Sequence, residues 1–162
     1  MNTLRDCRAE DFPHILEIIN AAAAVYRGVI PADCWHEPYM TAEHLREEMA
    51  AGVSFVGCEV DGELVGVMGM QRVDDVDLIR HAYVKPGAQG GGIGAALIAE
   101  LMKRSSRRVL VGTWAAASWA IRFYEKNGFV RASDERAAHL LARYWIISAR
   151  QVETSVVLVR ER

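Results

Sequence analysis

Apolar residues near the start of the chain recur first at strand spacing and then at helical spacing. The run from Thr3 to Arg8 predicts a short strand. A helix follows, whose apolar face comprises Phe12, Ile15, Ile19 and Ala22. Asp11 stands at its N-cap and Pro13 lies in its first turn, which are both typical of a helix start. A second short helix is expected after Thr41, with Gly52 at its end.

Three strands are predicted next, and turn residues separate them. Ser54 to Val60 alternates apolar and polar residues, and Leu64 to Met70 returns after Asp61-Gly62. This dipeptide is the signature of a tight hairpin, because both turn residues need positive φ. The third strand, Val76 to Val84, ends before Pro86, which lacks the N–H that a sheet requires.

The second half of the chain alternates helices and strands. A glycine-rich loop opens a helix from about Ile93 to Arg104, and Val109 to Trp114 forms a short apolar strand. A helix from about Ser118 ends near Gly128. A helix at Glu135–Arg143 and a final strand from Val152 to Val159 complete the pattern. This order predicts one α/β domain over residues 1–162, with some parallel strand pairing and covering helices.

Composition excludes several classes of protein. The 162 residues carry 19 basic and 21 acidic side chains, for a formal net charge of −2. A general nucleic-acid binder needs an excess of positive charge, so no nucleic-acid partner is expected. We expect no membrane partner either, because no apolar run is long enough to cross a bilayer. Three cysteines match no zinc or redox motif and fit a reducing cytoplasm, and no signal peptide is apparent.

The strongest chemical signal is the glycine-rich segment between the third strand and the following helix. It reads Gln89-Gly90-Gly91-Gly92-Ile93-Gly94-Ala95. The first N–H groups of a helix lack intrahelical partners, and the helix dipole adds partial positive charge there. Glycines let a phosphate approach these donors closely, so the segment predicts an anion site suited to a pyrophosphate.

Two other phosphate-binding motifs do not fit this segment. Residues 90–95 match the dinucleotide pattern G-x-G-x-x-A, but the next strand, Val109 to Trp114, carries no acidic residue to hold a ribose. A P-loop needs Lys followed by Ser or Thr after its last glycine, whereas this chain has Ala95-Ala96.

The segment is similar to the coenzyme A loop of the GCN5-related N-acetyltransferase (GNAT) family, through Gln89, Gly92 and Gly94. The resemblance implies a mixed, mostly antiparallel twisted sheet flanked by helices. It also implies that this sheet is splayed between the strand at 76–84 and the strand at 109–114. The co-substrate would be acetyl-CoA, without a metal. The implied pyrophosphate-binding residues are Gln89, Gly90, Gly91, Gly92, Ile93, Gly94 and Ala95.

A second stretch, Phe123-Tyr124-Glu125-Lys126-Asn127-Gly128-Phe129, resembles the other signature of the family. There the matching tyrosine lies near the coenzyme A sulfur, so Tyr124 is expected to protonate the departing thiolate. A phenol can donate to a thiolate as charge develops on sulfur. The family often carries Asn where this chain has Ala117, so Ser118 is the candidate for the missing contact to the pantetheine arm.

The strand before the glycine loop should supply the remaining groups. By the resemblance, the backbone of Ala82, Tyr83 and Val84 pairs with the pantetheine amides, and one N–H polarises the thioester carbonyl. His81 is a candidate general base, because imidazole changes charge near neutral pH. A water chain is an equal alternative. Since strand side chains alternate between faces, Arg80 and His81 should not both point at the substrate.

The acceptor amine is the least defined component. Family members place it near the first two helices, so Tyr26, Trp35 and Tyr39 are candidate substrate-binding residues, although core packing would suit them equally. The sequence thus predicts an N-acetyltransferase acting on a primary amine of a small molecule or peptide, by direct attack in a ternary complex. The alternative is an acyl-CoA-binding module without turnover. Association into a homodimer stays open.

Overall fold

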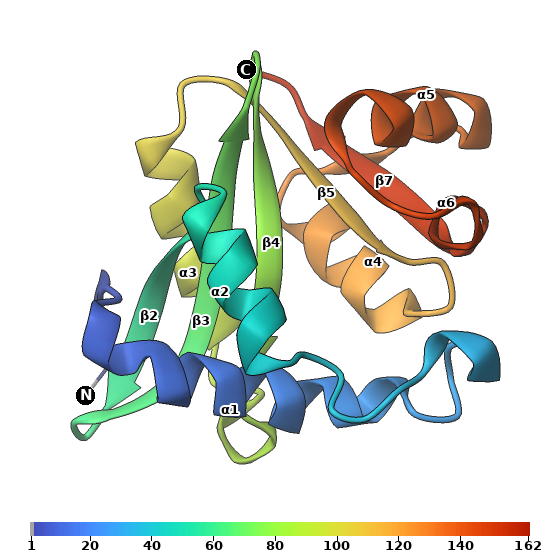
Figure 1. Cartoon of the computed structure of the whole chain (residues 1–162). Helices are drawn as coiled ribbons and strands as arrows, with labels where there is room; N and C mark the ends of the chain where they lie inside the picture. Colours follow the sequence, from blue (N-terminus) through green and yellow to red (C-terminus); the bar gives the residue numbers. More distant parts are fainter. Residues whose placement is uncertain (1) are drawn as a thin grey trace.

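A computed structural model describes residues 2–162 of the chain. Within these residues one sheet has the strand order β1-β2-β3-β4-β5-β7-β6 (Figure 1). Its strands are β1 (Asn2–Asp6), β2 (Ser54–Val60), β3 (Glu63–Val73), β4 (Val76–Val84), β5 (Arg108–Trp114), β6 (Val130–Arg131) and β7 (Ser155–Arg160). The helices are α1 (Phe12–Ala23), α2 (Ala42–Ala50), α3 (Ile93–Arg104), α4 (Ser118–Lys126), α5 (Asp134–Tyr144) and α6 (Ala149–Thr154).

The sheet is mixed and mostly antiparallel, as the resemblance implied. Only β4 and β5 run parallel among the paired strands of residues 2–162. Their register extends from Val76 opposite Arg108 to Ile79 opposite Val111 and then stops. Beyond these residues the carboxyl halves of β4 and β5 are no longer bonded to each other. The predicted splay is therefore present, and it opens the centre of the sheet.

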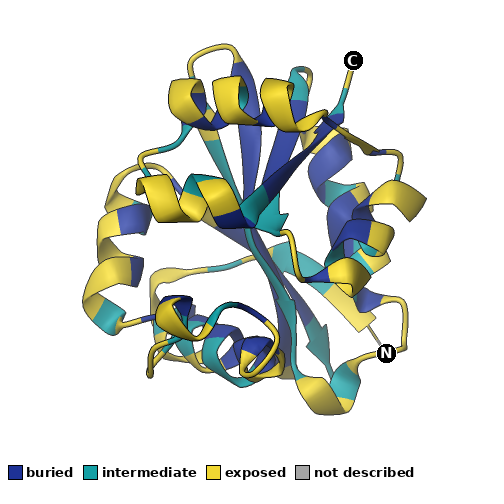
Figure 2. Cartoon of the chain, turned by 90° about the vertical axis from the view of Figure 1, so that its right-hand side faces the viewer, coloured by how far each residue is buried: buried dark blue, intermediate teal, exposed yellow. Residues whose placement is uncertain are grey.

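Helices cover both faces of the sheet, because alternate strand residues point to opposite sides. Ile79 and Val111 pack in a cluster with α3 and α4, whereas Leu78 and Leu110 pack with α5. In Figure 1, α1 and α2 lie in front of β2–β4 with α3 behind them. The strands are mostly buried, and the helices turn exposed faces to solvent (Figure 2). The open part of the sheet thus lies between two helical layers.

Local sequence signals explain most of the element boundaries. The Thr41 hydroxyl accepts a hydrogen bond from the His44 N–H at 3.1 Å and caps α2, as predicted. Asp61 and Gly62 adopt φ values of 52° and 82°, as the hairpin signature requires. Asp11 is the N-cap residue of α1, as predicted, but its side chain does not cap this helix, because it accepts from the backbone of Arg8 in the short 3-10 turn at Ala9–Asp11.

The predicted last strand began too early. Val152 lies in α6, and β7 starts only at Ser155. The cause is a capping box, in which Ser148 and Gln151 satisfy each other's backbone N–H groups and nucleate one helical turn. This turn carries the chain back over the sheet before β7 pairs with β5.

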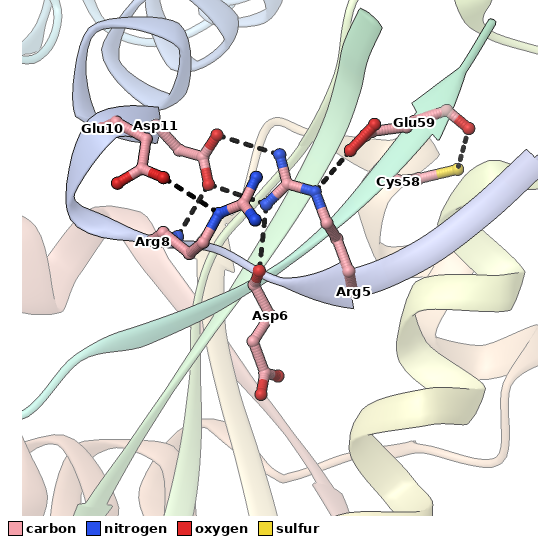
Figure 3. A network of polar contacts seen from close by, with 7 residues as sticks. All are labelled: Arg5, Asp6, Arg8, Glu10, Asp11, Cys58 and Glu59. Carbon is pink, nitrogen blue, oxygen red and sulfur yellow. Dashed lines mark hydrogen bonds and ion pairs between the residues drawn. The ribbon is translucent and has the colours of Figure 1, made fainter. Parts of the chain in front are cut away.

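The side chain of Asp11 ties the start of α1 to the edge of the sheet (Figure 3). Its carboxylate accepts two hydrogen bonds from the Arg5 guanidinium, at 2.7 and 2.9 Å, and one from the Arg8 N–H at 2.7 Å. Arg5 also pairs with Glu59 of β2. Asp11 is only 5% exposed, and its hydrogen bonds with Arg5 hold the pKa of its carboxyl group well below the ordinary value. This charged network anchors α1, which forms one wall of the site below.

We expect Asp11→Asn to lower the free energy of unfolding by about 2–3 kcal/mol at neutral pH, because it leaves Arg5 without its main partner. A carboxyl group with a lowered folded-state pKa stabilises the fold above its unfolded pKa of about 4, and this contribution disappears as the pH falls further. The difference in free energy of unfolding between the parent and Asp11→Asn, measured by urea titration, should therefore shrink below about pH 4. Asp6→Asn is the control: Asp6 is 72% exposed on its ion pair with Arg104, so the change should stay within about 0.5 kcal/mol. An equal loss in both variants would contradict the role of Asp11.

Candidate active site

The glycine-rich segment forms the opening turn of α3. Gly90 and Gly92 have φ values of 87° and 78°, a region that side chains disfavour, and Gly92 is the N-cap. The Gln89 amide donates to the Val84 carbonyl at 3.1 Å and closes the loop against the end of β4. A Cβ added at Gly90 or Gly92 would meet no atom within 4 Å, so open space lies directly over the helix start. The first N–H groups of α3 face a region that an anion can enter.

A cavity of about 770 Å³ extends from this turn into the open part of the sheet. Its walls include most of the predicted cofactor-binding residues, namely Ala82, Tyr83, Val84, Gln89, Gly90, Gly92, Ile93, Gly94, Ala95 and Tyr124. Gly91 and Ser118 are absent from the described lining, although Gly91 lies at the start of α3 and Ser118 at the start of α4. The volume is in the range that small-molecule sites have.

A β-bulge at the end of the regular β4 ladder shapes the middle of the cavity. Val67 pairs with Tyr83 and Gly69 pairs with Arg80, so two residues of β4, His81 and Ala82, oppose the single residue Met68. His81 has a φ of 57°, which is uncommon for a residue with a side chain. Such bulges redirect side chains and often occur beside active sites.

Gly69 makes this bulge possible. A Cβ at this position would lie 2.7 Å from the Arg80 carbonyl oxygen and 3.0 Å from the Phe55 ring. Only glycine lets the backbone of β4 approach β3 as closely as the bulge requires. Gly69 of β3 therefore permits the unusual backbone of His81, which lies on the neighbouring strand.

The bulge directs His81 toward a buried carboxylate on α2. His81 Nε2 lies 2.5 Å from Glu48 Oε1, and the Arg80 guanidinium donates to the same oxygen at 3.1 Å. His44 Nε2 lies 2.6 Å from the other oxygen, Glu48 Oε2. The expectation that Arg80 and His81 point to opposite faces was wrong, because the bulge breaks the alternation and both side chains reach one carboxylate.

Glu48 remains charged in this setting. Burial acts to raise the pKa of its carboxyl group, but the hydrogen bond with His81 and the charges of His81, Arg80 and His44 outweigh it and hold the pKa below its ordinary value. A fixed carboxylate orients the imidazole through its hydrogen bond. Glu48 is thus a positioning group for His81.

Tyr124, on α4, also lines the large cavity. Its ring packs edge-on against Phe123 and Phe129 in the cluster that covers α3 and α4. Burial raises the pKa of its phenol well above the ordinary value, so the hydroxyl stays protonated at neutral pH. Core packing therefore holds the ring in place, while the residue also lines the cavity.

A second cavity, of about 170 Å³, adjoins the first through the gap between β4 and β5. Ile79, His81, Tyr83, Gly112, Thr113 and Tyr26 line both cavities. We call the smaller one the aromatic chamber. Its remaining walls are Tyr39, Arg80, Trp114, Leu141, Trp145, Ile147, Gln151 and Ser155.

The predicted substrate-binding residues gather around this chamber. Tyr26 lies near three other rings of the chamber, with centroid separations of 5.4 Å to Tyr39, 6.4 Å to Tyr83 and 6.5 Å to Trp114. The Trp114 indole N–H donates to the Tyr39 hydroxyl at 2.9 Å. Trp35 is outside the described lining and stacks on the outer side of Tyr39, at 5.9 Å. Tyr26 and Tyr39 therefore border the chamber, and Trp35 supports one of them.

Sequence reasoning missed Glu48 and the C-terminal wall of the chamber. One local signal for Glu48 exists, since it falls three residues after the buried Leu45 and so occupies the apolar face of α2. Its pairing with β4 joins residues 33 positions apart, which no local pattern reveals. Trp145 and Gln151 lie between the predicted helix at Glu135–Arg143 and the predicted strand from Val152, where the pattern indicated no element.

In residues 2–162, no group of three or more His, Cys, Asp or Glu side chains has an arrangement that could hold a metal ion. No helix in the same range is long and apolar enough to span a bilayer.

Comparison with known proteins assigns the family. A model of the acetyltransferase (GNAT) domain matches residues 6–142, which is most of the chain. The chain belongs to the GNAT acetyltransferase family. No functionally curated protein matches the sequence. The GNAT match includes the glycine-rich turn, the bulged strand and Tyr124.

Solved GNAT-fold structures agree with this assignment. The PaiA N-acetyltransferase of Thermoplasma acidophilum, in complex with coenzyme A, is 19% identical with a TM-score of 0.73, over 100% of this chain and 99% of that one. The ribosomal-protein-S18-alanine N-acetyltransferase of Escherichia coli is 18% identical with a TM-score of 0.71, over 99% and 94%. An N-acetylglutamate synthase of Neisseria gonorrhoeae, complexed with coenzyme A and N-acetyl-glutamate, is 22% identical with a TM-score of 0.67, over 99% and 35%. At these identities the likeness shows the fold alone.

Proposed function

We propose that this protein is an acetyl-CoA-dependent N-acetyltransferase that acts on a primary amine by direct attack in a ternary complex. The observation that carries the proposal is the gap between β4 and β5. Through it, the large cavity at the start of α3 meets the aromatic chamber at His81. Two substrates entering from opposite sides of the sheet would meet within this gap.

The residues present fit acetyl-CoA. The glycine turn offers N–H groups without intrahelical partners and free space above them, which suits the diphosphate. Beyond Ile79 the β4 backbone has no partner strand on the β5 side within the described residues, so it can pair with the amides of the pantetheine arm. Bound acetyl-CoA would supply an activated acetyl thioester. The chemistry would fall to His81, Tyr124 and one backbone N–H of β4.

His81 would act as the base, with Glu48 fixing its orientation. His81 Nε2 faces the carboxylate, which leaves Nδ1 as the nitrogen that can accept a proton from the amine. The amine attacks as the free base, because an ammonium group has no lone pair. Its first proton is lost to solvent before attack, and His81 accepts the second as the carbon–nitrogen bond forms. His81 lines both cavities, so it borders the place where the amine nitrogen and the acetyl carbon would meet.

The proton balance closes with Tyr124. His81 takes the proton that the amine releases as its nitrogen bonds to the acetyl carbon. A backbone N–H of the splayed part of β4 can stabilise the negative charge on the carbonyl oxygen. Tyr124 gives its hydroxyl proton to the sulfur as the carbon–sulfur bond breaks, and exchange with water restores both side chains.

Tyr124→Phe should lower kcat by about tenfold to a hundredfold, because it removes the proton donor from a ring that otherwise keeps its packing. The affinity for acetyl-CoA, measured by calorimetry, should change little. Tyr144→Phe is a matched control, since its hydroxyl is bonded at 2.6 Å to Asp75 and lies outside both linings. A kcat for Tyr124→Phe equal to the parent would remove the tyrosine from the mechanism.

The proposed function is tested by coupling thiol release to an amine panel. Calorimetry should detect acetyl-CoA binding, and free thiol should appear only when a suitable amine is added. Tight binding without turnover on any amine or peptide would favour a non-catalytic acyl-CoA-binding module. Absence of binding would refute both functions.

A further inference from the structure

We propose that the aromatic chamber is the acceptor site, and that it selects a small primary amine carried on one flat apolar group, such as an arylalkylamine, over polyamines. This inference rests on the proposed N-acetyltransferase function and adds a substrate class to it. Three properties of the chamber carry it: its size, the nature of its walls, and its charge.

The volume of the chamber suits one small group. At about 170 Å³ it is far smaller than the cavity at the start of α3. An apolar cavity of about 150 Å³ is sufficient for one benzene molecule. One ring with a short amine-bearing arm therefore fills the chamber, and its nitrogen would project toward His81 and the gap.

The walls suit a flat apolar group. Tyr26, Tyr39, Tyr83, Trp114 and Trp145 contribute five rings. Tyr26 packs on Tyr39 and Trp114 at tilted or edge-on angles of 48° and 62°, the geometry that aromatic pairs prefer. Leu141 and Ile147 add two aliphatic side chains to the lining. Aromatic pairs contribute beyond their buried area, so such walls distinguish a ring from an open chain.

The charge of the chamber disfavours a second ammonium group. No aspartate or glutamate belongs to its described lining. Glu48 contacts two lining residues, but its oxygens are already engaged by His81, Arg80 and His44. Burial raises the pKa of Tyr26 to about 12 and also raises that of Tyr39 and Tyr83, so these phenols remain neutral at physiological pH. The guanidinium of Arg80 in the wall is paired with Glu48, so this ion pair offers no free counter-charge for a cation. A diamine would bury its second cation without a counter-ion.

The test compares kcat/KM, from thiol release, for 2-phenylethylamine, putrescine, spermidine and an alanine-initiated tripeptide. We expect 2-phenylethylamine to exceed each of the others by about tenfold or more. Calorimetric titration of 2-phenylethylamine into the protein saturated with coenzyme A gives a second readout that does not depend on turnover. Binding of this amine should be detectable, and binding of putrescine should be much weaker.

Two substitutions locate the selectivity in the chamber. Trp145→Ala should lower kcat/KM for 2-phenylethylamine by about tenfold while the calorimetric affinity for acetyl-CoA is kept. Ile146→Ala is its control, because Ile146 is fully exposed and outside both linings.

Should Trp145→Ala fail to fold, Gln151→Glu tests the same placement of the acceptor. Glutamate keeps the oxygen that accepts from the Ser148 N–H, so the capping box survives while a carboxylate enters the wall. This variant should raise kcat/KM for putrescine relative to 2-phenylethylamine by about fivefold.

The outcomes separate the two levels of the proposal. Turnover that favours spermidine, putrescine or the tripeptide would overturn the substrate class and leave the N-acetyltransferase function intact. If the ratio of kcat/KM for putrescine to kcat/KM for 2-phenylethylamine is the same in the parent and in Gln151→Glu, the placement of the acceptor in the chamber is also overturned. Acetyl-CoA binding without turnover on any amine would overturn the function itself, and with it this inference.

Discussion

His81→Ala should lower kcat by about a hundredfold or more, with little change in the affinity for acetyl-CoA. General base catalysis by a positioned side chain contributes about 10²–10⁴-fold. His81 is the imidazole that borders both cavities, and its orientation is fixed by Glu48 at 2.5 Å. Thiol-release assays over a range of pH should also show that the variant lacks the part of the pH–rate profile that an imidazole base produces.

The two histidines on Glu48 provide a matched control for this result. His44→Ala removes the partner of Glu48 Oε2, but His44 lies outside both linings, so its effect on kcat should be much smaller. Glu48→Gln should lower kcat and change the pH profile, because an amide can accept the same hydrogen bond without stabilising the imidazolium. A pH profile of His81→Ala that matches the parent would leave the water chain as the route for the proton.

Gly92→Val should abolish the binding of acetyl-CoA detectable by calorimetry, and with it the rise in melting temperature that the ligand produces. Gly92 is the N-cap of α3 and has no atom within 4 Å of a Cβ position, so a branched side chain would occupy the space above the free N–H groups. The φ of 78° adds strain, and we expect a loss of about 1–2 kcal/mol in stability of the unliganded protein.

Gly87→Val separates these effects. Gly87 lies in the same loop, a Cβ there also meets no atom within 4 Å, and the residue is outside the described cavity lining. This variant should keep acetyl-CoA binding within a few-fold of the parent. Unchanged ligand-induced stabilisation in Gly92→Val, with the fold intact, would mean that the diphosphate does not sit on this turn.

The elements that the sequence predicted best are those whose signals are local. β4 spans Val76–Val84 and α3 spans Ile93–Arg104, as expected, because Pro86 and the glycine turn set their ends. The candidate cofactor residues were found in the same way, since an anion site at a helix start depends on a few consecutive backbone groups. The predicted loop consequently lines the cavity at six of its seven positions.

The remaining features depend on contacts between distant segments. The bulge that directs His81 arises from Gly69 on another strand, and the partner of His81 comes from α2. The aromatic chamber needs the chain after α5 to fold over β5, where Trp145 lies 3.4 Å from the Cβ position of Gly112. Alternation along a single strand predicts neither arrangement, because it assumes a regular ladder on both sides.

The most direct test of this account is a crystal structure of the protein with acetyl-CoA. We predict that the diphosphate lies within hydrogen-bonding distance of the backbone N–H groups of residues 89–95. The acetyl group should then enter the gap between β4 and β5, beside His81 and Tyr124. A diphosphate bound away from this turn, or an acetyl group outside the gap, would contradict the account.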